Sequence, residues 1–225
     1  MSIGTTLKSS IGAKALMAVT GIILVLFVIG HMLGNLQVYL GADALNAYAA
    51  KLQSLGPLLW VIRLVLLGTF LAHISAALRV VRLNKAARPV AYQQQKDQAT
   101  TFAARTMWVS GVLILLFAVY HVLHLTVGVV DPAGAYGALD SEGRHDVYGM
   151  VIAGFQHWPT TAIYTVAMVV LCLHVSHGAS SMLQTLGLRR PGNASNFDKV
   201  GPALAIFLLI GNLSMPLSIL AGLVG

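Results

Sequence analysis

Five long apolar stretches, separated by short polar segments, dominate the pattern of hydrophobic and polar positions along the chain. A helix needs about 20 apolar residues to cross a bilayer, and each stretch is long enough. Helices are expected because every backbone N–H and C=O must find a partner inside lipid. The pattern predicts an all-α integral membrane protein, a single transmembrane domain over residues 1–225, with spans at approximately 15–40, 57–80, 106–130, 159–186 and 200–224.

Two local signals refine these spans. Pro159 is expected to open the fourth membrane helix inside the uncharged run 147–188, because proline suits a first helical turn. The first apolar run is too long for a cleavable signal peptide, so we expect an uncleaved span. His145 and His157 precede the fourth helix, where we expect them to be solvated or interfacial.

Composition supports a membrane protein. Only 9% of the residues are charged and the mean hydropathy is +0.78, whereas about 25% are charged in an ordinary soluble domain. So few charged groups cannot cover the surface of a water-soluble globule. The single cysteine, Cys172, excludes a disulfide framework, cysteine-ligated zinc and iron–sulfur clusters in this chain.

The basic residues are distributed unevenly between the two ends of the predicted spans. Of the 14 Lys and Arg, three (Lys51, Arg63 and Arg144) lie on one side, which also holds five of the seven acids. The positive-inside rule therefore predicts a cytoplasmic N-terminus and an outer C-terminus. Anionic lipid headgroups are the expected partner of the basic side, and no basic stripe typical of nucleic-acid binding is present. The basic side carries Lys8, Lys14, Arg79, Arg82, Lys85, Arg88, Lys96, Arg105, Arg189, Arg190 and Lys199.

Six of the eight histidines fall inside the predicted spans. A lone intramembrane histidine is often a neutral ring bonded to a neighbouring helix, but ionisable residues in a bilayer are costly and usually functional. Four of them lie 14 or 15 residues into four successive helices. Because successive helices run in opposite directions, these four are expected at two depths. His31 and His121 would share an outer level, and His73 and His174 an inner level.

Two histidine pairs at two depths match the needs of two six-coordinate haems b. Each iron would take one imidazole from each of two facing helices, so the first four helices would form a haem-binding four-helix bundle. The chain has no C-x-x-C-H sequence, which excludes covalent c-type attachment. His124 and His177 each follow a proposed ligand by three residues on nearly the same helix face, so spacing leaves them open as ligands, propionate partners or quinone residues.

Other residues near these histidines have two possible roles each. Arg79, Arg82 and Arg105, near the inner interface, are candidate partners of haem propionates, although interfacial arginines commonly snorkel. Gly30 and Gly34 would give a macrocycle room or form a helix-packing motif. Thr69, four residues before His73, would bond that ring or its own backbone.

Several short motifs, in this order and spacing, resemble a known family over nearly the whole chain. The sequence is similar to the five-span, dihaem cytochrome b membrane-anchor subunit of succinate:quinone oxidoreductases, a group that includes bacterial succinate dehydrogenases and quinol:fumarate reductases. The motifs are Ser10-Ile-Gly-Ala-Lys14, Met17-Ala-Val-Thr-Gly21, His31-Met-Leu-Gly-Asn35, His73 with Asn84-x-x-x-Arg88-Pro89 and Tyr92, Tyr120-His-Val-Leu-His-Leu-Thr126, Gly154-Phe-Gln, Tyr164, and His174-Val-Ser-His-Gly178 with Leu186-Gly187.

The resemblance implies a role for each histidine pair. His31 with His121 would bind the outer haem, and His73 with His174 the inner one. The family pattern His-x-x-x-Gly matches His174, which favours it over His177 as a ligand. An aromatic residue precedes His121, as the family pattern requires, which favours it over His124.

The resemblance also implies partners and a location. A flavoprotein with FAD and an iron–sulfur subunit would dock on the cytoplasmic loops 79–105 and 189–199, and electrons would pass to menaquinone or ubiquinone in a bacterial cytoplasmic membrane. This chain would be part of an enzyme, a succinate dehydrogenase or fumarate reductase, without carrying the succinate site. Polar groups near the outer haem, namely His124, Asn35 and Gln37, are the quinone-site candidates.

One departure from the family limits what is transferred. Some dihaem fumarate reductases have a membrane glutamate two residues before the fourth-span histidine, where this chain has Cys172. We therefore assign no proton pathway. Two alternative functions remain: the cytochrome b anchor of a hydrogenase or formate dehydrogenase, and a proton-coupled transporter, which would have broken helices near the midplane.

Overall fold

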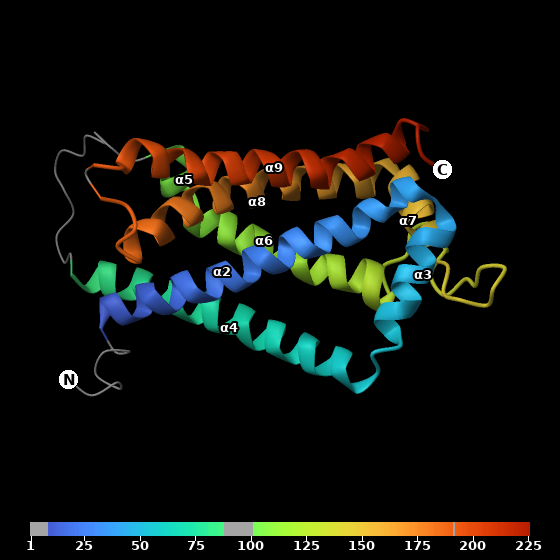
Figure 1. Ribbon diagram of the computed structural model, residues 1–225, viewed down its shortest axis with the longest axis horizontal. Coiled ribbons are helices and arrows are strands. Elements are labelled where there is room, and N and C mark those ends of the chain that lie inside the picture. Colours follow the sequence, from blue (N-terminus) through green and yellow to red (C-terminus); the bar gives the residue numbers. More distant parts are fainter. Residues whose placement is uncertain (1–8, 88–100, 191) are drawn as a thin grey trace.

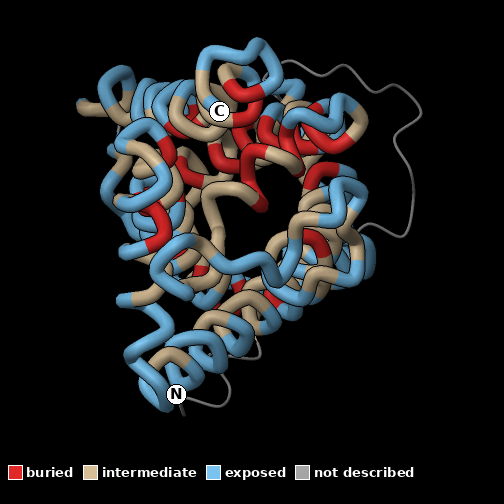
Figure 2. The backbone as a smooth tube through the Cα atoms, turned by 90° about the vertical axis from the view of Figure 1, so that its right-hand side faces the viewer, coloured by how far each residue is buried: buried red, intermediate tan, exposed pale blue. Residues whose placement is uncertain are grey.

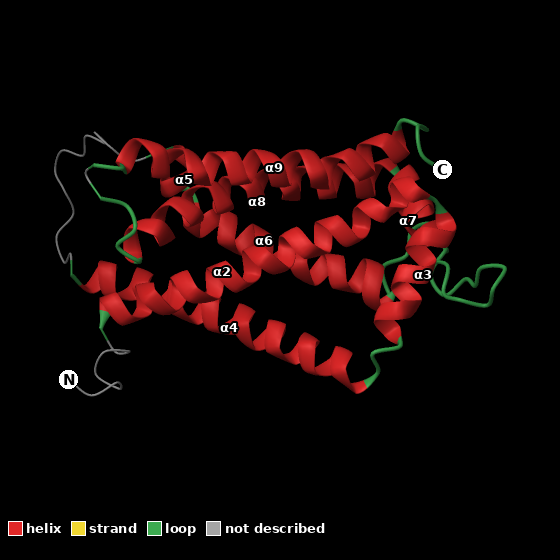
Figure 3. Ribbon diagram, viewed as in Figure 1, coloured by secondary structure: helices red, strands yellow, loops and turns green. Residues whose placement is uncertain are grey.

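The computed structural model describes residues 9–87, 101–190 and 192–225, and this part of the chain is helical apart from its connections (Figure 3). It contains an isolated bridge between Leu139 and His145 but no strand. Five of the described segments are long and apolar enough to cross a membrane, which confirms the predicted all-α membrane protein with five transmembrane helices. They are Ser10–Leu40, Pro57–Ala86, Met107–Val127, Trp158–Thr185 and Ala194–Leu220.

The helices follow the chain order labelled in Figure 1. Two spans change helix type before their outer ends, the first into a 3₁₀ turn and the third into a π turn. The elements are α2 (Ser10–Asn35), η1 (Leu36–Leu40), α3 (Ala42–Gln53), α4 (Pro57–Ala86), α5 (Phe102–Arg105), α6 (Met107–Val122), η2 (Leu123–Val127), α7 (Val147–Gln156), α8 (Trp158–Thr185) and α9 (Ala194–Leu220).

Local sequence signals start several of these helices. The Ser9 hydroxyl accepts a hydrogen bond from the Gly12 N–H at 3.0 Å and caps α2. Proline stands in the first turn of α4 and of α8, and Pro159 of α8 is where the sequence predicts it. The stretch before Pro159 forms the separate helix α7, capped by Asp146, whose carboxylate accepts from the Gly149 N–H at 2.9 Å.

Helix α8 contacts α2, α5, α6, α7 and α9, and α2 also packs against α4. Figure 2 shows buried residues turned toward the inside of the bundle and exposed residues on its outer surface. Many of the exposed residues are large and apolar, such as Leu26, Trp60 and Leu116. An apolar outer surface is what a bilayer requires of helices that face lipid.

The two ends of the bundle differ in structure and charge. The N-terminal end of α2, the C-terminal end of α4 and the short helix α5 lie at one end, and α3 and α7 lie at the other (Figure 1). The N-terminal end of α2 and the C-terminal end of α9 lie at opposite ends of the bundle, because five spans lie between them. Of the basic residues expected on the cytoplasmic side, Lys8, Arg88 and Lys96 lie outside the described residues.

Two short helices, α3 and α7, cover the end opposite the N-terminus. They contact each other, and their apolar residues join the ends of the first, fourth and fifth spans in one core. Val38, Leu45, Phe155 and Ile219 are almost fully buried in it. This core fixes the outer ends of the spans that carry His31 and Tyr164.

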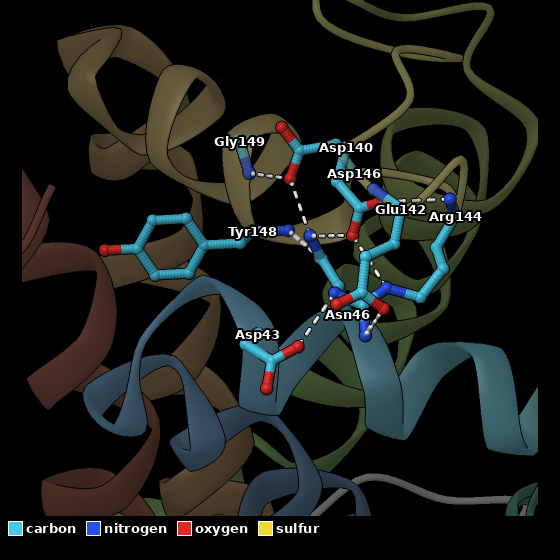
Figure 4. Close-up of polar contacts among 8 residues, drawn as sticks. All are labelled: Asp43, Asn46, Asp140, Glu142, Arg144, Asp146, Tyr148 and Gly149. Carbon is cyan, nitrogen blue, oxygen red and sulfur yellow. Dashed lines mark hydrogen bonds and ion pairs between the residues drawn. The ribbon is translucent and has the colours of Figure 1, made fainter.

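A polar network, here called the outer clasp, joins α3 to the loop before α7 (Figure 4). The buried Asn46 donates to Asp140 at 3.2 Å and to Asp146 at 3.0 Å, and accepts from the Tyr148 N–H at 2.9 Å. Arg144 pairs with three carboxylates across the network. The clasp consists of Asp43, Asn46, Asp140, Glu142, Arg144, Asp146, Tyr148 and Gly149.

Hydrogen bonding within the clasp changes the acidity of its members. Burial alone would raise the pKa of Asp140, but hydrogen bonds from the side chain and backbone of Arg144 outweigh it and leave that pKa below its usual value. The same bond to Asp140 raises the pKa of the Arg144 guanidinium. Asp140 and Arg144 are therefore both charged at neutral pH.

Candidate histidine site within the helix bundle

His31 of α2 and His121 of α6 form an outer pair. Their ring centroids are 5.6 Å apart and their planes are perpendicular. Phe27, one turn before His31, stacks on that ring with a centroid separation of 5.5 Å. The structure therefore brings together the two residues that the sequence assigns to one level.

The separation of this pair suits a shared metal ion. Bonds between imidazole nitrogen and a metal are about 2 Å long, and the ring centroid lies about 1 Å behind the nitrogen, so two rings on opposite sides of one ion have centroids about 6 Å apart. The observed 5.6 Å is close to that value.

His73 of α4 and His174 of α8 are the two residues that the sequence assigns to the inner level. Each ring is held by a hydroxyl from a neighbouring helix. Thr20 Oγ1 of α2 lies 3.1 Å from Nδ1 of His73, and Ser110 Oγ of α6 lies 3.1 Å from Nδ1 of His174. Four helices thus contribute to this level, two with histidines and two with hydroxyls.

The hydrogen bonds of these hydroxyls determine the histidine tautomers. Thr20 Oγ1 lies 2.7 Å from the Leu16 carbonyl, so its one proton goes there and its oxygen accepts from His73. Ser110 Oγ lies 3.1 Å from the Met107 carbonyl, so it accepts from His174 in the same way. Both rings therefore carry their proton on Nδ1 and leave the Nε2 lone pair free. A histidine that ligates a metal through Nε2 is commonly oriented by such a bond.

Tyr164 of α8 occupies the corresponding place at the outer level. Its hydroxyl oxygen lies 3.1 Å from Nδ1 of His121 and 3.0 Å from Nδ1 of His124. The tyrosine ring also packs edge-on against Phe117 and Phe155. An aromatic cluster from α6, α7 and α8 therefore surrounds this hydroxyl.

His124 has a different environment from His121. Its ring is almost fully buried and lies against Gly154 of α7, where an added Cβ would be 3.2 Å from Nε2. His121 is only half-buried and faces His31. His124 is thus packed into the aromatic cluster on the side away from the outer pair.

The remaining histidines are not paired in this way. His177 is half-buried and has no hydrogen bond to any described residue. His157 is exposed, as the sequence predicts, and its Nδ1 lies 3.0 Å from Thr160 Oγ1. His145 is half-buried: its Nδ1 is buried without a partner among the described residues, and its ring packs edge-on against Tyr136.

The structure decides between the alternative roles that the sequence left open for Thr69 and for the two glycines Gly30 and Gly34. Thr69 donates to the Val65 carbonyl of its own helix at 2.8 Å, so it is not the partner of His73. A Cβ added at Gly34 would lie 2.7 Å from the Tyr48 hydroxyl, whereas one added at Gly30 would meet nothing within 4 Å. Gly34 therefore serves close packing with α3, and Gly30 has open space beside His31.

The polar candidates for propionate and quinone binding lie at the two ends of the bundle. Arg79 lines a shallow groove with Ala13 of α2, and Arg82 lines a second groove with Lys85 and Trp108. The remaining candidates are Arg105, at the end of α5, and the half-buried Asn35 and Gln37, where α2 gives way to η1.

Among the described residues, no three His, Cys, Asp or Glu side chains gather closely enough to hold a bare metal ion. The histidines occur as pairs, which suits a metal that brings further ligands of its own. Comparisons of the chain with protein-family models, curated proteins and solved structures found no match.

Proposed function

We propose that this chain is the dihaem cytochrome b membrane anchor of a succinate:quinone oxidoreductase. The observation that carries the proposal is the occurrence of two histidine pairs on four helices, with three of the four Nδ1 atoms bonded to hydroxyls. Those bonds orient the rings and, at the inner level, leave Nε2 free to ligate iron. An iron porphyrin needs two axial imidazoles and supplies the other four ligands itself.

The residues have distinct roles in this proposal. His31 and His121 would hold the outer haem, His73 and His174 the inner one, and the bound haems would supply reversible one-electron chemistry at iron. The chain's own groups orient the imidazoles, exclude water with an apolar exterior, and separate the two sites by depth. Ligation also offsets the cost of placing polar rings in lipid.

The two ends of the bundle suit different partners. The basic end, which includes Arg79, Arg82 and Arg105, would face the cytoplasm, hold haem propionates and dock an iron–sulfur subunit that is joined to a flavoprotein with FAD. The outer end, with Asn35, Gln37 and His124, is the proposed region for menaquinone or ubiquinone. The membrane would be a bacterial cytoplasmic membrane, crossed five times.

A haem assay of the purified chain tests the proposal. A reduced-minus-oxidised spectrum should show haem b, and a pyridine haemochrome assay should give about two haems per chain. The double variant His31→Ala/His73→Ala, which removes one ligand from each level, is the negative control. A wild-type chain without haem b would refute the proposal.

Co-purification from native membranes identifies the complex. A flavoprotein and an iron–sulfur protein are expected to accompany the chain, and the isolated complex should reduce a quinone with succinate. A nickel or molybdenum enzyme in their place would assign the same dihaem bundle to a hydrogenase or a formate dehydrogenase. Proton-driven solute uptake by a haem-free chain would instead support a transporter.

A further inference from the structure

Tyr164 contacts both histidines of the third span through one hydroxyl group. Its oxygen is 3.1 Å from Nδ1 of His121 and 3.0 Å from Nδ1 of His124. Among the described residues this hydroxyl has no other hydrogen-bond partner. Because the tyrosine is buried, its polar atom depends on these two contacts.

The proton count at this hydroxyl restricts the two rings. A phenol has a single proton, so it cannot donate to both Nδ1 atoms. If it accepted from both rings, its own proton would have no partner in an apolar surrounding, which is costly. The arrangement that gives a partner to the phenol proton and to both Nδ1 atoms has one ring donating to Tyr164 and Tyr164 donating to the other. Two neutral rings bonded in this way have opposite tautomers.

We propose that Tyr164 is a positioning residue that gives His121 the tautomer of an Nε2 iron ligand and gives His124 the opposite one. The inference rests on the proposed function only because it takes iron as the atom that His121 ligates. A ring that ligates through Nε2 must carry its proton on Nδ1. With the shared hydroxyl in place, only one of the two histidines meets that condition.

Packing determines which histidine it is. The His124 Nε2 faces Gly154, at a distance that leaves no space for a macrocycle. The His121 ring faces His31 across 5.6 Å. The hydrogen bonds therefore run from His121 Nδ1–H to Tyr164 and from the Tyr164 hydroxyl to His124 Nδ1. His124 then has its proton on Nε2, the atom that faces Gly154.

Histidine tautomers can be measured directly by ¹⁵N NMR on the haem-free, full-length chain in detergent micelles. The expected spectrum has His121 protonated at Nδ1 and His124 at Nε2. In Tyr164→Phe this difference should disappear, whereas Tyr120→Phe, which removes a neighbouring hydroxyl that bonds neither ring, should preserve it. The same tautomer for both rings in the wild-type chain would overturn the inference.

The haem-loaded chain gives a second readout. Tyr164→Phe should weaken binding of one haem about tenfold, by analogy with the loss of other bonds that orient ligands, and should change one low-spin EPR signal without affecting the other. His124→Ala should have a similar effect because the Tyr164 proton loses its acceptor, and His124→Gln should restore the signal. Wild-type EPR signals in both Tyr164→Phe and His124→Ala would contradict the assignment.

These results separate the inference from the proposed function. Opposite tautomers in a chain that binds no haem would reject the dihaem function and retain the control of tautomers by Tyr164. Two bound haems with matching tautomers would reject the inference alone. If Tyr164→Phe does not fold, the His124→Ala and His124→Gln pair decides the question with the tyrosine in place.

Discussion

The inner and outer histidine pairs are held by different kinds of hydrogen bond. At the inner level, Thr20 and Ser110 each donate within their own helix and accept from one ring. At the outer level, Tyr164 is shared by His121 and His124. The inner rings are therefore oriented independently of each other, whereas the outer ring is coupled to a second histidine. Substitutions that affect one level and not the other test this difference.

Loss of an axial ligand should have the largest effect. His31→Ala or His121→Ala should remove the outer haem, and His73→Ala or His174→Ala the inner one, so each variant should have half the wild-type haem content. The pyridine haemochrome assay measures this directly. His177→Ala is the matched control and should keep two haems.

The ligand assignment changes if these variants behave otherwise. Retention of both haems in His174→Ala would assign the inner ligand to His177. Retention of both in His121→Ala, with loss of one in His124→Ala, would assign the outer ligand to His124.

Removal of the inner hydroxyls should weaken haem binding without abolishing it. Thr20→Val and Ser110→Ala keep the packing and remove the acceptor of the Nδ1–H bond, so the affinity of one haem should fall about 10- to 100-fold. Titration of the haem-free chain with haemin measures this. Thr69→Val is the control, because Thr69 bonds only its own helix, and an equal loss in that variant would argue against a specific role for Thr20.

Replacing a glycine beside each histidine level with alanine adds one methyl group. The change in stability should show how tightly each level is packed. In Gly154→Ala the new Cβ would meet the His124 ring at 3.2 Å, and that ring is held by Tyr164, so we expect a loss of about 1 kcal/mol in unfolding free energy. In Gly111→Ala the nearest His174 atom would be 3.7 Å away, an ordinary contact. Its stability should change by less than about 0.5 kcal/mol. Reversible unfolding in mixed micelles provides the comparison, and equal losses would show that both levels are equally tight.

Acidification should have the smallest effect, and the outer clasp contributes to it. The folded-state pKa of Asp140 lies below its unfolded value, so its stabilising contribution is complete above about pH 4 and is lost as the pH falls through the folded value. The melting temperature should therefore decrease on acidification below about pH 4. Asp140→Asn should flatten this dependence more than Glu142→Gln, whose carboxylate is mostly exposed.

The sequence predicts the spans well because lipid imposes a long apolar segment on each of them. It does not separate α7 from α8, since the uncharged run 147–188 covers both helices and only Pro159 marks the boundary. Charge also gives no sign that Asn46 and Arg144, about a hundred positions apart, belong to one network. That proximity depends on the outer ends of the spans meeting.

At the site, the sequence predicts the histidines but not the groups that orient them. Spacing along one helix suggests Thr69 as the partner of His73, whereas the partner is Thr20 on the neighbouring helix. A hydroxyl on another helix has no fixed offset in sequence from the ring it bonds. In the sequence Tyr164 stands out only as part of a family motif, and its bond to two rings depends on how α6 and α8 pack.

The π turn formed by Leu123–Val127 affects how the third span tolerates a change in its number of residues. A π turn closes its hydrogen bonds over one residue more than an α turn. Deleting one residue here would convert the π turn into an α turn and leave the residues beyond it close to their present orientation. Those residues include Thr126, whose carbonyl accepts from the Tyr136 hydroxyl at 2.7 Å. The third span thus contains one extra residue in its last turn, and the span should tolerate the loss of that residue.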